Sequence, residues 1–203
     1  MPLYLPPAPE PAERCVRTAL RSPVVRAPHS RESHRVHPEG REVRESREDL
    51  VPARPLPVHQ WEVGAAPAAS APLVGWRFLL MRDGLPVGTA ETRLTADGWA
   101  FSHFGEGPYA ASTDLALRRA DELEETWSPC LLSVPRLYML TLWLRPAGKA
   151  DGPPEPATGG PVAGDLLVPL APAPPGIAAN RPMTAATLHA LVGSRLAPAQ
   201  LAG

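Results

Sequence analysis

The chain has 203 residues, a formal net charge of −1, 28 prolines and 16 glycines. This near-neutral balance offers no basic excess for binding a polyanion, and its two cysteines are too few for the disulfide scaffold of a small secreted domain. The most apolar run, Leu137–Leu144, is far shorter than the about 20 residues that a membrane helix needs, which excludes a helical membrane protein.

Residues 1–72 are rich in proline, arginine and glutamate, and no aromatic residue lies between Tyr4 and Trp61. A segment with so little apolar surface does not offset the entropy lost on ordering, so the sequence predicts a disordered arm. Gly64–Pro72 would join it flexibly to a domain. Two origins fit the arm: a translated linker, or an upstream extension of the reading frame, which GC-rich genes readily allow.

The segment His29–Asp49 of this arm raises two functional hypotheses. The first is a metal site, whose ligands would be His29, Glu32, His34 and His37. Because Pro38 and Gly40 interrupt any helix that could hold these side chains, we expect no defined metal site. The second is nucleic-acid binding by the arginines, which the interleaved acids and the missing aromatic residues disfavour.

Residues 73–203 predict one small domain that begins with three antiparallel strands. Trp76–Met81 alternates in polarity, Asp83-Gly84 is typical of a two-residue hairpin turn, and Val87–Leu94 would be the returning strand. Asp97-Gly98 indicates a second turn before a third alternating strand, Trp99–Phe104.

A helix over Leu115–Trp127 follows in the prediction, with one apolar face. Ser112, Thr113 and Asp114 are its candidate N-cap residues. The apolar segment Cys130–Pro146 comes next and predicts a strand that is apolar on both faces. Such a strand is either central and covered on both sides or a surface for a partner.

The rest of the domain is predicted to contain a mobile loop at residues 146–164, a short strand in Asp165–Pro172 and a final helix over Met183–Leu196. We expect Cys130 to be a buried apolar residue and not a catalytic thiol. The order of elements predicts an α+β domain with a mostly antiparallel sheet of about five strands and two packed helices.

Three segments, "GWRFLLMRDG", "PRLYMLTLWLR" and "DLLVPLAPAPPGI", in this order resemble short uncharacterised proteins of GC-rich actinobacteria. The resemblance covers residues 75–196 and leaves the arm outside. It implies no activity and no site residues.

The chain contains no phosphate-binding glycine loop, no CxxC, no HExxH and no GxSxG motif. The best catalytic candidates are His103, Glu106 and Tyr109, which surround a glycine-rich turn and could form a pocket with Trp127. A histidine and a carboxylate so close in the chain could act as acid and base. The sequence predicts no cofactor and no metal ion.

Three functions follow as hypotheses. The leading one is a small, non-catalytic protein that binds another protein, because catalytic motifs are absent, Leu137–Leu144 is apolar on both faces, and proline-rich segments are preorganised for docking. The alternatives are a small-molecule-binding domain or minor enzyme near His103, and a nucleic-acid accessory protein that uses the arm. Without the pattern of a secretory signal at its start, the protein is expected to be cytoplasmic.

Overall fold

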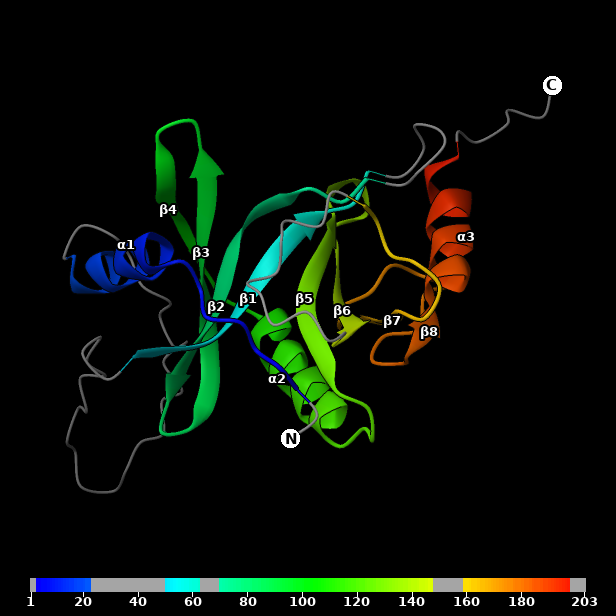
Figure 1. Ribbon diagram of the computed structural model, residues 1–203, viewed down its shortest axis with the longest axis horizontal. Helices are drawn as coiled ribbons and strands as arrows, with labels where there is room; N and C mark the ends of the chain where they lie inside the picture. Colours follow the sequence, from blue (N-terminus) through cyan, green and yellow to red (C-terminus); the bar gives the residue numbers. More distant parts are fainter. Residues whose placement is uncertain (1–2, 23–49, 63–69, 148–158, 198–203) are drawn as a thin grey trace, which may run out of the picture.

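The computed structural model describes residues 3–22, 50–62, 70–147 and 159–197, which form three α-helices and one eight-stranded sheet (Figure 1). The elements are α1 (Glu10–Arg21), β1 (Val51–Gln60), β2 (Leu73–Arg82), β3 (Leu85–Thr95), β4 (Gly98–Gly105), α2 (Pro108–Asp121), β5 (Trp127–Val134), β6 (Met139–Pro146), β7 (Leu166–Pro169), β8 (Met183–Thr184) and α3 (Ala185–Leu196). The strand order is β4-β3-β2-β1-β5-β6-β7-β8, and every neighbouring pair is antiparallel except β1 and β5.

The predicted meander is confirmed as β2, β3 and β4. Asp83 and Gly84 between β2 and β3 have φ angles of 50° and 76°, as the two central residues of a type I′ turn require. Because Gly84 has no Cβ and aspartate tolerates the left-handed region, this dipeptide closes the hairpin at little cost.

The prediction of a disordered arm over residues 1–72 is wrong for two segments. β1 lies inside the sheet, between β2 and β5, and α1 packs on the sheet through Ala12 and Val16, both fully buried. Strand β1 tolerates its three prolines through a bulge, where Arg54 takes a φ of 47° and the register with β2 shifts. Residues 23–49, with the candidate metal ligands, and residues 63–69 lie outside the described residues.

The apolar segment Cys130–Pro146 is two strands and not one. Residues Pro135–Leu137 form a 3₁₀ turn, and Tyr138 follows with a φ of 50°, so β5 and β6 pair as a hairpin. Every residue of Met139–Leu144 is buried. Met139–Leu144 is therefore covered on both faces, which is the first of the two alternatives, whereas Tyr138 in the turn is exposed.

The predicted helix is displaced: α2 begins at Pro108 and ends at Asp121. Pro108 occupies the first turn, where its missing N–H costs no hydrogen bond, so the helix starts before the expected caps. Ser112, Thr113 and Asp114 are consequently buried inside the helix, and Trp127 is the first residue of β5. The final helix is confirmed as α3, where the Thr184 hydroxyl accepts a hydrogen bond from the Thr187 amide.

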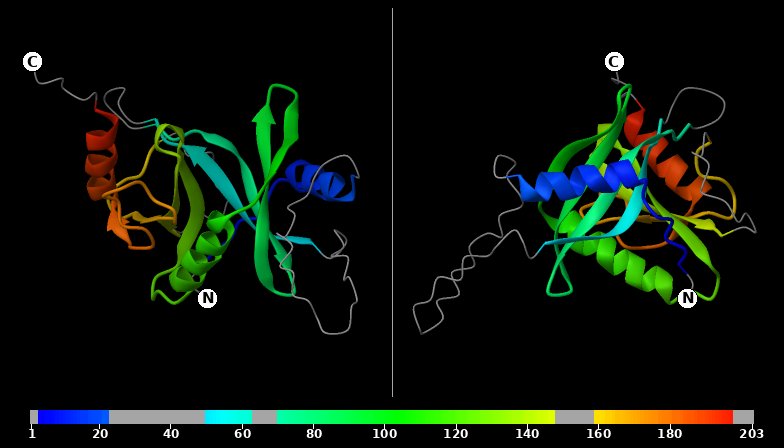
Figure 2. Two further views of the ribbon diagram at one scale, coloured as in Figure 1. Left: turned by 180° about the vertical axis from the view of Figure 1, so that it is seen from behind. Right: turned by 60° about the vertical axis from the view of Figure 1, so that its left-hand side comes forward.

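Neighbouring residues of one strand point to opposite faces of the sheet and therefore belong to different parts of the core. Leu79 and Leu131 pack with α2 on one face of the sheet, whereas Leu80 packs with α1 and Leu132 with α3 on the other. Helices α1 and α3 lie at opposite ends of the molecule with α2 between them (Figures 1 and 2). The sheet is thus covered on one face by α2 and on the other by two separate helices.

The α+β class is confirmed, but the described residues contain eight strands and three helices where about five and two were predicted. Most of the loop expected at residues 146–164 lies outside the described residues. Within the part of the chain that the structure describes, no helix is long and apolar enough to cross a membrane.

Candidate functional site

A β-bulge in the edge strand β4 brings two polar side chains to the same face of the sheet. Thr92 on β3 pairs with Phe101 and Glu91 pairs with His103, so Ser102 is an extra residue without a partner in the register. Phe101 and Phe104 both pack toward α1, with ring centroids 4.8 Å apart. Ser102 and His103, which lie between them, therefore both face the opposite side.

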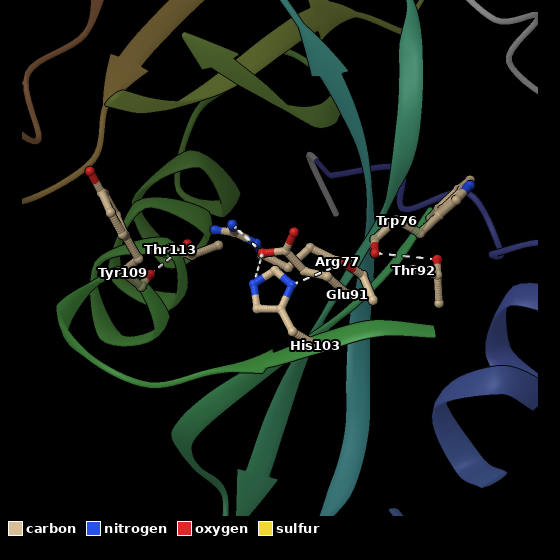
Figure 3. Close-up of polar contacts among 8 residues, drawn as sticks. Trp76, Arg77, Glu91, Thr92, His103, Tyr109 and Thr113 are labelled. Atoms are coloured by element: carbon tan, nitrogen blue, oxygen red, sulfur yellow. Dashed lines mark hydrogen bonds and ion pairs between the residues drawn. The ribbon is translucent and has the colours of Figure 1, made fainter. Parts of the chain in front are cut away.

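His103 continues a row of polar side chains that Arg77 on β2 and Glu91 on β3 begin (Figure 3). The Ser102 hydroxyl lies 3.1 Å from Nδ1 of His103, and Nε2 of His103 lies 3.6 Å from Oε1 of Glu91. The same Glu91 oxygen accepts a hydrogen bond from Nη2 of Arg77 at 2.5 Å. Arg77 and Glu91 are largely buried, whereas Ser102 and His103 are exposed. The row thus runs from a sheltered ion pair to an accessible hydroxyl.

Tyr109 does not join this row. Its hydroxyl lies within donating distance of the carbonyl oxygens of Tyr138 and Pro172, at 2.7 and 2.9 Å, and its side chain points away from His103 (Figure 3). Burial raises the pKa of the Tyr109 phenol, and the Arg77 guanidinium partly opposes that shift. Tyr109 therefore fastens α2 to the β5–β6 turn, which is a structural role.

The other predicted site residues also separate. Glu106 is exposed between β4 and α2, and Trp127 is buried in the core beneath α2. Asp114 is neither a cap nor exposed. Its carboxylate is 2% exposed and makes ion pairs with Arg54 at 3.4 Å and Arg118 at 3.0 Å. Asp114 thereby ties the bulged strand β1 to α2.

A second polar cluster is buried beneath α3, on the other face of the sheet. The Trp143 indole and the Val162 amide both donate to Oδ2 of Asp165 at 2.8 Å. The His59 ring packs edge-on against Trp143, and its Nδ1 lies 2.8 Å from the carbonyl oxygen of Ala71. Burial raises the pKa of the neighbouring Cys130 thiol to about 12, so this cysteine is an unreactive thiol at neutral pH.

His59 makes the stability of the fold depend on pH. Burial lowers the pKa of His59 below its ordinary 6.5, an effect that the Arg145 guanidinium reinforces and the bond to Ala71 opposes. The unfolded chain then binds a proton that the folded chain excludes, so the free energy of unfolding falls below about pH 6.5. The free energy of unfolding then changes by at most about 1.4 kcal/mol per pH unit, the value for one proton taken up on unfolding.

Urea unfolding of the wild type and His59→Asn between about pH 7.5 and 5 measures this contribution. We expect the loss of stability in acid to be shallower in His59→Asn, because asparagine can still donate to Ala71 without titrating. The matched variant His189→Asn replaces an exposed histidine on α3 and should follow the wild type. Parallel curves for the wild type and His59→Asn would contradict the assignment.

No group of three or more histidine, cysteine, aspartate or glutamate residues with metal-binding geometry occurs among the described residues. In comparisons with known proteins, no family model, curated protein or solved structure matches the chain. The resemblance to actinobacterial proteins therefore stays a prediction, and any functional argument rests on the residues themselves.

Proposed function

We propose that this protein is cytoplasmic and works by binding an extended segment of another protein along the edge strand β4. The observation that carries the proposal is the unprotected character of this edge. Among the residues that the structure describes, strand β4 pairs only with β3, and its eight residues, GWAFSHFG, contain no lysine, arginine, aspartate, glutamate or proline. Natural sheets usually protect a long edge with such residues, because its free N–H and C=O groups pair readily with another chain.

The opposite edge of the sheet illustrates the usual protection. Strand β8 has only two residues, Met183 and Thr184, so it offers little backbone for pairing. Strand β4 is longer. In the described part of the chain its protection consists of its bulge and, near its start, α1, where the Cys15 thiol donates to the Trp99 carbonyl. The second half of β4 carries the exposed residues Ser102 and His103.

The side chains of β4 supply apolar surface for such a partner. Trp99, Phe101 and Phe104 are half-buried against the core beneath α1, which leaves part of each ring accessible. An added strand would bury this surface while its backbone paired with β4, as in other cases of strand addition. Aromatic side chains, tryptophan and tyrosine above all, are enriched among the buried central residues that supply most of the binding energy of protein interfaces.

The binding surface proposed on β4 differs from the one that the sequence predicted. Met139–Leu144 lies in the core, and the proline-rich segment that follows β7 packs onto the fold through Leu170 and Ile177. The free cysteines Cys15 and Cys130 fit a reducing compartment, which supports the cytoplasmic location. Nucleic-acid binding by the arm stays a prediction, since six of its ten arginines lie in residues 23–49, outside the described part.

Site-specific photo-crosslinking tests the proposal. The photoreactive amino acid p-benzoylphenylalanine is placed at Ser102 or, as a control, at Leu85, which is 64% exposed on the β2–β3 turn. Both variants are irradiated in the source organism and the products identified by mass spectrometry. We expect a partner cross-linked at Ser102 and absent at Leu85, with the cross-link inside one extended segment of that partner.

A synthetic peptide of the cross-linked segment then distinguishes strand addition from other contacts. We expect it to bind the wild type, and we expect N-methylation of its alternate backbone amides to abolish binding, because strand addition depends on main-chain hydrogen bonds. Ser102→Lys should weaken binding and Leu85→Lys should not. Equal cross-linking at both positions, or binding that is insensitive to N-methylation, would overturn the proposal.

A further inference from the structure

We propose that Ser102 is a nucleophile for activated acyl and phosphonyl compounds, with His103 as its base. This inference is independent of strand addition at β4. It rests on the bulge, which places a hydroxyl and an imidazole side by side, and on the row of polar groups behind the imidazole.

The bulge is the essential feature, because consecutive residues of a regular strand point to opposite faces of a sheet. With Phe101 and Phe104 both packed toward α1, Ser102 and His103 share the other face, and the hydroxyl lies 3.1 Å from Nδ1. Bulges occur often next to active sites, where they redirect a side chain. A serine within hydrogen-bonding distance of an imidazole is the arrangement that activates a hydroxyl nucleophile.

The groups behind His103 position its ring. Oε1 of Glu91 lies 3.6 Å from Nε2, slightly beyond hydrogen-bonding distance. Its negative charge favours the tautomer with the proton on Nε2, which leaves the lone pair of Nδ1 facing Ser102. It also stabilises the imidazolium that forms when Nδ1 takes a proton. Arg77 holds Glu91 in place through the 2.5 Å hydrogen bond. Glu91 and Arg77 are thus positioning residues, and the order serine, histidine, carboxylate matches the roles found in unrelated hydrolytic sites.

With an activated ester, the reaction is an acyl transfer to Ser102 that is followed by hydrolysis to the carboxylic acid. The Ser102 oxygen attacks the carbonyl carbon, the proton of the hydroxyl passes to Nδ1 of His103, and the bond between carbon and the leaving alkoxide or phenoxide breaks. The imidazolium returns the proton to the medium or to the leaving group. Water then hydrolyses the acyl-serine and regenerates the hydroxyl. With a fluorophosphonate the same oxygen attacks phosphorus, fluoride leaves, and the adduct is stable.

A fluorophosphonate probe on the full-length protein, followed by peptide mass spectrometry, tests the proposal. Ser194, an exposed serine on α3 whose hydroxyl donates to the Leu191 carbonyl, is the internal control. We expect Ser102 to be labelled at least about ten times faster than Ser194, because His103 can take the proton of the attacking hydroxyl.

Three variants test His103 as the base and Glu91 as a positioning residue, with His189 as the control. His103→Ala should slow labelling of Ser102 about tenfold or more, with partial recovery when free imidazole is added. His189→Ala, at an exposed histidine on the distant helix, should leave the rate unchanged. Glu91→Gln should slow labelling less than His103→Ala does. Circular dichroism confirms that each variant is folded.

Labelling of Ser102 no faster than that of Ser194 would overturn the proposal, and so would an unchanged rate in folded His103→Ala. Neither outcome bears on strand addition, whose cross-linking test does not depend on reactivity. Conversely, rapid labelling of Ser102 without any partner cross-link would retain the nucleophile and reject the binding function.

Discussion

Replacing Leu56 by aspartate is expected to unfold the protein, with a loss of about 4 kcal/mol or more in the free energy of unfolding. Leu56 is 1% exposed in β1 and packs in the core beneath α2. An aspartate there would have to ionise away from water or protonate, and its desolvation costs about several kcal/mol in addition to the lost apolar burial. Circular dichroism and urea unfolding provide the measurement.

Val51→Asp is the matched control, because Val51 belongs to the same strand but is 59% exposed. We expect a change of only about 1 kcal/mol or less, from the lower strand propensity of aspartate. If residues 1–72 were a disordered arm, both substitutions would be neutral. Equal, small effects of the two variants would therefore contradict the placement of β1 in the sheet.

Leu142→Asp is expected to have an effect of the same size. Leu142 is fully buried in β6, paired with Leu131 on one side and Val168 on the other. The substitution puts a carboxylate into the core beneath α2 and should give an unfolded or aggregated product. A folded Leu142→Asp variant that loses only a binding partner would instead identify this strand as an interaction surface.

Tyr138→Asp serves as the control for that experiment. Tyr138 lies at the β5–β6 turn, only four positions away, and its side chain is 90% exposed. Its backbone supplies the contacts that the turn needs, since its amide donates to Pro135 and its carbonyl accepts from Tyr109. We expect the variant to fold, with a change of less than about 1 kcal/mol.

The elements that the sequence predicted well are those with local signals. Two turn dipeptides predict the meander of β2, β3 and β4, and a threonine cap followed by an apolar face predicts α3. Strand β1 has no such signal, because its ten residues include three prolines and show no regular alternation of apolar and polar side chains. Its place is decided by long-range pairing with β2 and by parallel pairing with β5, neither of which a local pattern reveals.

The candidate site was missed for a geometrical reason. A regular register would place Ala90 opposite Arg77 from the Asp83-Gly84 turn, and Ser102 opposite Glu91 from the turn that the structure forms at Ala96-Asp97. One extra residue in each hairpin, Val87 in β3 and Ser102 in β4, shifts the pairing so that Arg77, Glu91 and His103 lie in one row. Bulges depend on packing on both faces of the sheet, which single-sequence periodicity does not report. His103 was identified, but its carboxylate neighbour is Glu91 on the adjacent strand.

Amide hydrogen exchange of the full-length protein, with and without the peptide identified by cross-linking, tests the central claim most directly. That claim is that the edge of β4 is where the protein binds its partner. We predict slower exchange of amides within Trp99–Phe104 on binding, and unchanged exchange in α3. Protection confined to the Pro135–Tyr138 turn or to α3, with β4 unaffected, would contradict the account.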